Sequence, residues 1–227
     1  MTFSSFLRGI SSQPLFVLDN DIPLSQYVSI DLSETNTQLH SFNVSSSEDW
    51  SVFINDYCNQ KQAKVAFGGY NEKRNIYKRS NYFNQQNVDT ERNIHLGLDL
   101  WIAAGTTVYA PLEGVIYSFA INANYGDYGP TLVLKHQVHD VIFYTLYGHL
   151  SLDSLADKKV GQPIQQGEPI ATLGTAEVNG DYAPHLHFQI IRDMEGYNGD
   201  YPGVCNTKNL DKFLLNCPDP NVLLKLT

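Results

Sequence analysis

The stretch DYAPHLHFQI (residues 181–190) and its near copy DYGPTLVLKH (residues 127–136) decide the fold class. Each copy follows a glycine and then alternates apolar side chains with others, which is the two-residue period of a β-strand. Thr131 and Val133 stand in the first copy where His185 and His187 stand in the second. The fold therefore requires a strand at both places, and the histidines are additions that point to chemistry.

Strand-like segments of the same kind fill the chain from residue 63 to residue 194. Alternation broken by Gly, Pro and Asn recurs in AKVAFGGY, NIHLGLDLW, TTVYAPLEGVIYSFA, PTLVLKH, VIFYTLYGHL, GQPIQQGEPIATLG and HLHFQII. Many short strands with turn residues between them are typical of an antiparallel β architecture. We predict a mostly β fold, built as a sandwich or a barrel-like structure.

The two ends of the chain have a different pattern and predict three parts. PLFVL (14–18) and QYVSIDL (26–32) predict short strands, and SSSEDWSVFINDYCNQ predicts a helix that begins at a capping box of Ser45 and Glu48. A second short helix is expected near residues 208–215. We expect a small α/β N-terminal extension (1–62) packed on or beside the core, a core domain (63–194) and a C-terminal tail (195–227).

Composition excludes several classes of protein. The 227 residues carry a net charge of −9 with a pI near 5.1, which disfavours binding to nucleic acid or to anionic membranes. No apolar run reaches the roughly 18 residues of a membrane helix, and the start lacks the apolar region of a secretory signal, so a cytoplasmic location is expected. The three cysteines have no CxxC spacing. A disulfide between Cys205 and Cys217 is the alternative to free thiols.

Two segments place histidines and an aspartate on polar strand faces. His185 and His187 lie two residues apart and therefore project from the same side of a strand. In IHLGLDL, His95 and Asp99 share the polar face, but in an ideal strand their backbones are about 13 Å apart, which is long for sharing a metal. Gly97 between them is a position at which the backbone can bend or bulge.

A third histidine segment completes a set suited to a metal. His149 ends the predicted strand YTLYGHLS. Two imidazoles and one carboxylate suit Zn²⁺, and three protein ligands leave a position for water, as in catalytic zinc sites. Four histidines and one aspartate would supply three ligands and two proton-handling groups. Each motif taken alone also fits polar side chains on an exposed strand.

Five motifs carry a family resemblance. HLGLD, GTTVYAPLEGVI, LYGHLS, VGQPIQQGEPIATLG and APHLHFQI, in this order, resemble the lysostaphin-type (LytM) zinc metalloendopeptidases, which cut peptide bonds of peptidoglycan. The resemblance covers residues 93–191 and implies a duplicated, mostly antiparallel β fold and a peptide or peptidoglycan-derived substrate. It also implies one Zn²⁺ per chain, ligands His95, Asp99 and His187, and a catalytic pair of His149 and His185.

Departures from the family pattern and two other interpretations remain. Ala183-Pro184 stands where Gly-Pro is more usual, and Gln189 stands where Glu is common. TVYAPLEGVI and VGQPIQQGEPIATLG also resemble biotinyl and lipoyl carrier domains, but this stretch lacks their turn lysine. A non-catalytic peptide- or glycan-binding or regulatory module on the same fold is the second alternative, and the complete ligand set favours an enzyme over it.

Several other residues are expected to have no part in the chemistry. A tyrosine such as Tyr147 or Tyr182 could donate a hydrogen bond to the transition state. The simpler expectation is that both rings serve only in packing. The basic segment is expected to be a solvated loop, with a site for a substrate carboxylate as the alternative; its residues are Lys73, Arg74, Lys78 and Arg79. The remaining histidines are expected to be structural or on the surface: His40, His136 and His139.

Overall fold

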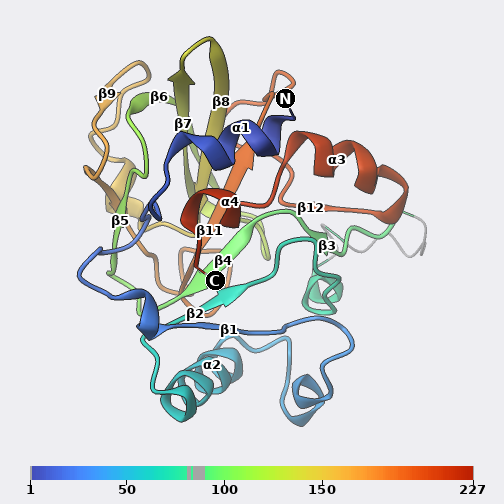
Figure 1. Cartoon of the computed structure of the whole chain (residues 1–227). Coiled ribbons are helices and arrows are strands. Elements are labelled where there is room, and N and C mark those ends of the chain that lie inside the picture. Colours follow the sequence, from blue (N-terminus) through green and yellow to red (C-terminus); the bar gives the residue numbers. More distant parts are fainter. Residues whose placement is uncertain (1, 81–82, 84–89, 227) are drawn as a thin grey trace.

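A large mixed β-sheet dominates the computed structural model, which describes residues 2–80, 83 and 90–226 (Figure 1). The sheet has eight strands, of which β1 and β2 run parallel and all other neighbours antiparallel. The prediction of a mostly β fold is confirmed. In spatial order the strands are β1 (Tyr27–Ser29), β2 (Val65–Gly68), β4 (Leu98–Trp101), β11 (His185–Ile191), β8 (Val141–Gly148), β7 (Gly129–Val138), β6 (Gly114–Asn122) and β9 (Pro163–Ile164).

Two small sheets accompany the large one. β5 (Thr107–Tyr109) pairs with β10 (Pro169–Thr172), and β3 (Ile94–His95) pairs with β12 (Val204–Cys205). β3 and β4 are separate strands in different sheets, so the chain leaves one sheet and enters the other between them. The predicted bend near Gly97 is therefore present.

The two similar sequence copies lie on either side of one strand of the sheet. β7 and β11 flank β8 on opposite sides, and Tyr147 of β8 is the partner of both Leu132 and Phe188. The two copies therefore lie on opposite sides of one central strand, with registers that differ by two residues, since Leu132 of the first copy corresponds to Leu186 of the second.

The two-residue period sorts the side chains of the central strands into two faces. Leu98 and Leu100 of β4, with Leu186 and Phe188 of β11, are buried in the main hydrophobic core. The alternate positions of the same strands face the other way and carry the polar residues, including both predicted histidines of β11. The core on one face thus fixes what the other face presents.

Both ends of the chain pack on this core. Helix α1 (Phe3–Ile10) contacts the short helix α4 (Asn221–Leu224), and Leu7 of α1 is fully buried in the main core (Figure 1). The strand predicted at residues 14–18 is wrong. That segment is joined to β5 by one backbone hydrogen bond, from Tyr109 to Val17 (2.9 Å), instead of a strand ladder. Helix α1 was not predicted.

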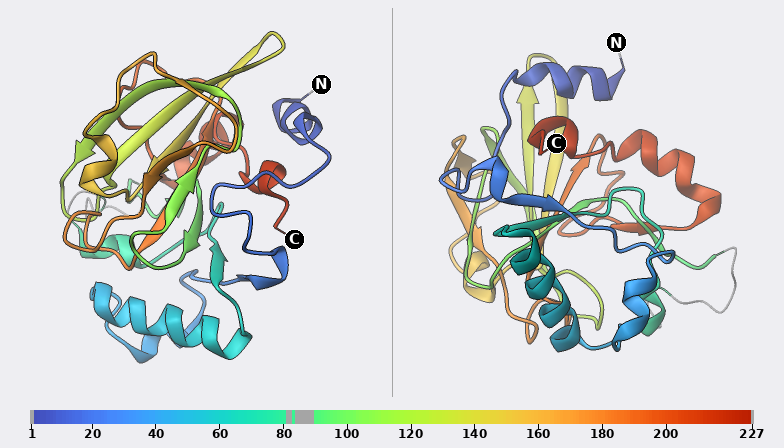
Figure 2. Two further views of the ribbon diagram at one scale, coloured as in Figure 1. Left: turned by 90° about the vertical axis from the view of Figure 1, so that its left-hand side faces the viewer. Right: turned by 60° about the horizontal axis from the view of Figure 1, so that its bottom comes forward.

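Helix α2 (Ser47–Lys61) covers a different part of the sheet, next to β1 and β2 (Figure 2). Its buried Trp50 and Ile54 pack in a cluster with Trp101 of β4. The predicted helix is confirmed, but its cap is one residue later than expected, since Ser46 accepts a hydrogen bond from the backbone N–H of Asp49 (3.1 Å). The remaining helical elements are η1 (Leu24–Gln26), η2 (Thr37–Ser41), η3 (Ile76–Arg79), η4 (Leu152–Leu155), η5 (Thr207–Asn209) and α3 (Leu210–Asn216).

The C-terminal tail contains a helix, and the three cysteines form no disulfide. Helix α3 lies where a short helix was expected in the tail. Cys58, Cys205 and Cys217 are free thiols, so the alternative of a disulfide is not realised. Among the described residues, no helix combines the length and the apolar character needed to cross a membrane.

Candidate active site

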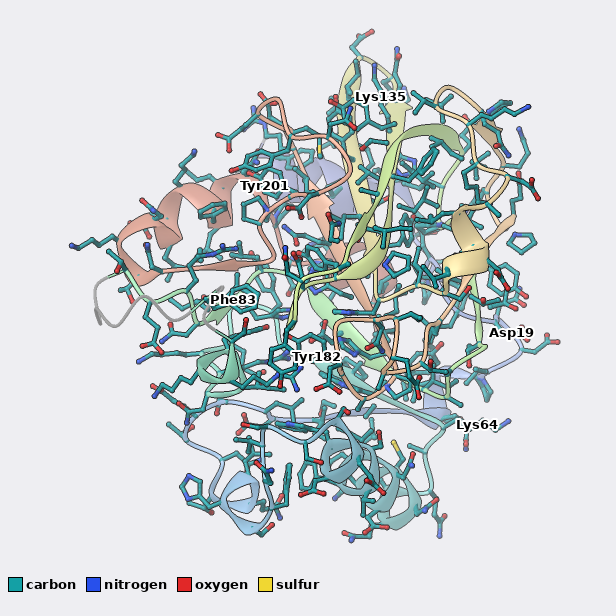
Figure 3. All side chains as sticks on the ribbon, turned by 180° about the vertical axis from the view of Figure 1, so that it is seen from behind. Asp19, Lys64, Phe83, Lys135, Tyr182 and Tyr201 are labelled. Carbon is teal, nitrogen blue, oxygen red and sulfur yellow. The ribbon has the colours of Figure 1, made fainter. Side chains whose placement is uncertain are left out.

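The polar face of β4 and β11 opens into a pocket of about 160 Å³. Tyr182, Tyr201 and Phe83 lie around it when the molecule is seen from behind (Figure 3). All five predicted site residues line this pocket, and each is buried: His95, Asp99, His149, His185 and His187. The interpretation of these residues as exposed side chains on a strand face is therefore wrong.

Strand register and one glycine bring the three predicted ligands together. Asp99 of β4 lies directly opposite His187 of β11, so both side chains leave the same face of the sheet. His95 arrives from β3, after which the chain turns at Gly97. A Cβ atom built on Gly97 would lie 2.6 Å from Nε2 of His187. The absence of a side chain at Gly97 therefore permits the close approach of the His187 ring.

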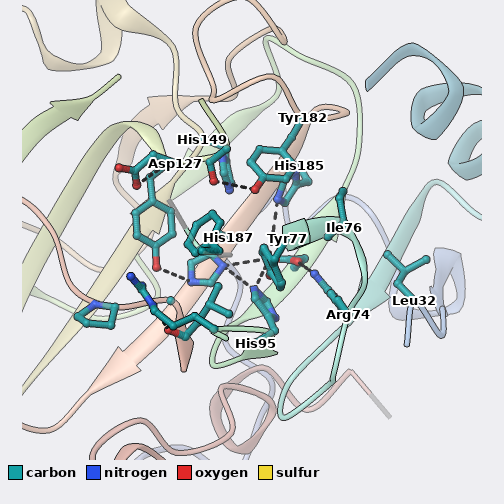
Figure 4. A pocket seen from close by; sticks show the side chains of 18 of the residues that line it. Leu32, Arg74, Ile76, Tyr77, His95, Asp127, His149, Tyr182, His185 and His187 are labelled. Atoms are coloured by element: carbon teal, nitrogen blue, oxygen red, sulfur yellow. Dashed lines mark hydrogen bonds and ion pairs between the residues drawn. The ribbon is translucent and has the colours of Figure 1, made fainter. Parts of the chain in front are cut away.

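Three acceptor atoms of these residues converge, and Figure 4 shows the His95 and His187 rings next to each other. Nε2 of His95 lies 2.8 Å from Nδ1 of His187, and Oδ1 of Asp99 lies 3.3 Å and 3.1 Å from these two nitrogens. Among the described residues, His95, Asp99 and His187 are the group whose ligand atoms lie close enough together to hold a metal ion.

The outward nitrogens of both rings determine where the imidazole protons lie. Nδ1 of His95 is 2.9 Å from the carbonyl oxygen of Gly69, and Nε2 of His187 is 2.9 Å from Oε1 of Gln189. Each outward nitrogen must donate to these oxygens, and a neutral imidazole has a single N–H. Both inward nitrogens therefore carry lone pairs that face a carboxylate oxygen, an arrangement that a cation stabilises and that suits Zn²⁺.

The surroundings of His95 and Asp99 disfavour the binding of protons to these two side chains, which leaves their lone pairs available to a cation. Burial lowers the pKa of His95 to about 4. Burial opposes the negative charge of Asp99, but His95 and Arg74 outweigh it and hold the pKa of this carboxyl well below its ordinary value. At neutral pH the group therefore consists of an ionised carboxylate and an uncharged His95.

His149 and His185 form a second pair of rings, with centroids 4.2 Å apart. Nδ1 of His149 is 2.7 Å from the carbonyl oxygen of Asn179, and Nδ1 of His185 is 2.7 Å from that of Ala183. Both rings thus donate through Nδ1 and keep a lone pair on Nε2. Burial lowers the pKa of both histidines, so both are uncharged proton acceptors at neutral pH.

Two tyrosines from the two sequence copies frame the histidines. The Tyr128 ring lies 4.9 Å from that of His187, and the Tyr182 ring lies 5.0 Å from that of His149. Tyr128 was missed in the sequence, although it occupies in DYGP the position that Tyr182 occupies in DYAP. The repeat is the signal from which Tyr128 could have been identified. Tyr147, in contrast, is buried in the main core and bonded to Thr145 (2.9 Å).

The basic segment is not a solvated loop, and this expectation is corrected. Arg74 is 5% exposed and its Nη1 lies 2.6 Å from Oδ2 of Asp99. Arg79 donates to the carbonyl oxygen of Asp181 (2.7 Å) and covers the Tyr182 ring at 4.3 Å. Both arginines point inwards because buried carboxylate and carbonyl oxygens attract them. Lys73 and Lys78 are exposed.

The other three histidines lie outside the pocket, as expected. His136 is buried, with Nδ1 2.7 Å from the carbonyl oxygen of Glu113 and Nε2 2.7 Å from the Thr145 hydroxyl. His40 and His139 are exposed.

A comparison with known families identifies the segment that carries the site. Residues 93–199 match the model of peptidase family M23. This segment, slightly less than half of the chain, is similar to the peptidases of that family. The resemblance inferred from the five motifs is thereby confirmed, and the match supports a hydrolase. The match favours this family over the alternative of a carrier domain.

Two curated relatives match this M23 segment. An uncharacterized metalloprotease of Haemophilus influenzae is 34% identical over 95 residues, which are 42% of this chain and 18% of the relative. The peptidoglycan DD-endopeptidase ShyC of Vibrio cholerae is 32% identical over 98 residues, 43% of this chain and 20% of the relative. The chain thus matches about a fifth of the length of these relatives. Neither comparison supports the expected cytoplasmic location.

Solved structures of similar proteins include two peptidases. The catalytic domain of lysostaphin from Staphylococcus simulans is 24% identical, with 53% of this chain and 80% of that chain covered and a TM-score of 0.38. A zinc-containing peptidase from Vibrio cholerae is 29% identical, with 46% and 31% covered and a TM-score of 0.34.

Proposed function

We propose that this chain is a zinc-dependent endopeptidase that hydrolyses an amide bond in peptidoglycan cross-links or in stem-peptide fragments. The observation that carries the proposal is the convergence of three unprotonated acceptor atoms, from His95, Asp99 and His187, beside two further imidazoles. The M23 match supports peptide-bond hydrolysis, and the peptidoglycan-cleaving relative supports the substrate class.

The proposed roles follow from the positions of the lone pairs. His95, Asp99 and His187 would hold one Zn²⁺, which when bound polarises the scissile carbonyl and lowers the pKa of a water toward about 7. His149 and His185 present their Nε2 atoms to the pocket, where one ring accepts a proton and a protonated ring delivers it to the leaving amine. The carbonyl oxygens of Asn179 and Ala183 keep both rings in the tautomer that this role requires.

Metal content and cleavage of purified peptidoglycan test the proposal together. We expect about one zinc per chain in tag-free protein by elemental analysis and new peptide termini in the digest by mass spectrometry. Asp99→Ala should lose both metal and cleavage, because it removes the anionic ligand. His185→Ala should keep the metal and lose roughly a hundredfold or more in cleavage, because it removes a proton-handling group.

Each other outcome has a distinct meaning. Zinc retained at full occupancy by Asp99→Ala would contradict the ligand set, and zinc lost from His185→Ala would contradict the division into ligands and catalytic pair. A zinc-loaded natural chain that cleaves no bond in peptidoglycan or its fragments would favour the non-catalytic binding module.

A further inference from the structure

Asp99 has a second carboxylate oxygen, and a buried arginine holds it. Oδ1 of Asp99 faces the two histidine nitrogens, while Oδ2 accepts a hydrogen bond from Nη1 of Arg74 at 2.6 Å. The Asp99 and Arg74 side chains are 2% and 6% exposed, so solvent does not screen this ion pair. The two oxygens of one carboxylate are therefore assigned to different partners.

Arg74 is in turn held in place from two directions. Its Nε donates to Oε2 of Glu72 at 2.5 Å, and Oε1 of Glu72 accepts from the backbone N–H of Leu32 at 3.0 Å. The backbone around Arg74 runs beside β3, with hydrogen bonds from Arg74 to Asn93 and from His95 to Glu72 (both 2.9 Å). The backbone bonds fix the position of Arg74 beside β3, and its contact with Glu72 holds the guanidinium next to Asp99.

The surroundings of Arg74 are not those of an ion pair kept for stability alone. Its Nη2 is buried and makes no hydrogen bond among the described residues, and a buried donor without a partner costs about 1–3 kcal/mol. A buried ion pair is also weak evidence for stability, because desolvation offsets its attraction. The Nη2 group fits only because Gly69 has no side chain, since a Cβ there would overlap it.

We propose that Arg74, fixed by Glu72, is a positioning residue that restricts Asp99 to a single metal-facing oxygen. This inference rests on the proposed metal site. Both residues precede the segment that matches family M23, so the site is completed from outside that segment. The consequence is an open coordination position, because a carboxylate bound through both oxygens would fill it.

The spectrum of the cobalt-substituted protein tests this inference without an activity assay. Co²⁺ takes the place of Zn²⁺, and its visible absorption bands weaken as the coordination number rises. We expect Arg74→Met to bind one Co²⁺ per chain with bands severalfold weaker than those of the natural chain, because the freed Oδ2 joins the metal. Lys73→Met removes a neighbouring exposed cation, paired with Glu34 at 2.9 Å, and should leave the spectrum unchanged.

A second variant keeps the inference testable if Arg74→Met does not fold. Glu72→Gln removes the charge that fixes Arg74 and should weaken the bands in the same direction, by less. Natural intensity in a variant that binds one Co²⁺ would overturn the positioning role and leave the proposed peptidase standing. Failure of the natural chain to bind Co²⁺ or Zn²⁺ would overturn both.

Discussion

At the residue scale, the direction of each imidazole proton decides what the site can do. Four histidines enter one pocket, and all four have an outward nitrogen within 2.9 Å of a carbonyl oxygen, backbone or side chain. Every proton is therefore directed away from the centre, and every inward nitrogen is an acceptor. This common orientation, more than the number of histidines, makes the pocket a candidate for a metal and for proton transfer.

Gly97 should tolerate no side chain. In Gly97→Ala the new Cβ would collide with the His187 ring, so we expect loss of bound zinc by elemental analysis together with a lower melting temperature. Gly9→Ala is the control, because nothing lies within 4 Å of its Cβ in α1. Gly9→Ala should raise the free energy of unfolding by about 0.5–1 kcal/mol, because alanine loses less conformational freedom than glycine when a helix forms. Full zinc occupancy in Gly97→Ala would show that the ring can move aside.

His136 predicts a dependence of stability on pH that is separate from the metal site. Burial lowers its pKa to about 4 from 6.5, so between these values the unfolded chain binds a proton that the folded chain excludes. Stability is therefore complete above pH 6.5 and declines as pH falls to about 4, by about 3 kcal/mol. Because burial also lowers the pKa of His95, His149 and His185, His136→Gln should make this decline shallower by about 3 kcal/mol, and not abolish it, in urea unfolding measured across this range. The exposed His139→Asn should retain it, and an unchanged slope in His136→Gln would refute the assignment.

At the scale of elements, strand register and a tethered turn place the catalytic pair. β11 begins at His185, and the turn before it is held from two elements. The Ser47 hydroxyl of α2 donates to Oδ1 of Asp181 (2.7 Å), and Arg79 of η3 donates to the Asp181 carbonyl oxygen. Elements distant in sequence thus fix the point at which the strand starts.

Loosening this turn should reduce turnover without removing the metal. We expect Arg79→Ala to cost roughly ten- to a hundredfold in kcat, because small displacements of a catalytic group have effects of this size. Zinc content should stay near one per chain, since Arg79 contacts no predicted ligand. Lys78→Ala, an exposed neighbour, is the matched control. Natural turnover in Arg79→Ala would mean that the turn is rigid without its arginine.

At the scale of the whole molecule, the parts outside the M23 segment belong to the same core. Leu7 from the N-terminal end and Leu223 and Leu224 from the C-terminal end are buried among the strand residues of the sheet. β1 is a strand of that sheet as well. We propose that the predicted parts 1–62, 63–194 and 195–227 unfold as one cooperative unit.

Two leucine substitutions test whether the three parts unfold together. Leu7→Ala removes a fully buried side chain and should lower the free energy of unfolding by about 2–5 kcal/mol. Leu215→Ala, at a side chain that is 74% exposed, should stay within about 0.5 kcal/mol of the natural chain. Urea unfolding should show a single shifted transition for Leu7→Ala. A separate early transition would show that the N-terminal part unfolds alone.

The sequence by itself determined the β architecture and the five polar side chains of the site. Both depend on local rules: a period of two sorts the faces of each strand, and Gly97 marks the break that closes a distance too long for a straight strand. The helix at residues 47–61 followed from its periodicity. The N-terminal helix and the irregular segment at residues 14–18 did not, because the core and β5, not local pattern, determine their conformation.

Only the tertiary structure decided which groups support the site. Arg74 pairs with Asp99, 25 residues away, and Gln189 sets the tautomer of His187. Tyr128 and Tyr182, one from each copy, lie against histidine rings of the site. No spacing in the chain encodes such contacts, since they arise where strands of different sequence position become neighbours. Arg74, which the basic segment suggests is solvent-exposed, lies in the interior because the carboxylate of Asp99 is buried and requires a cation beside it.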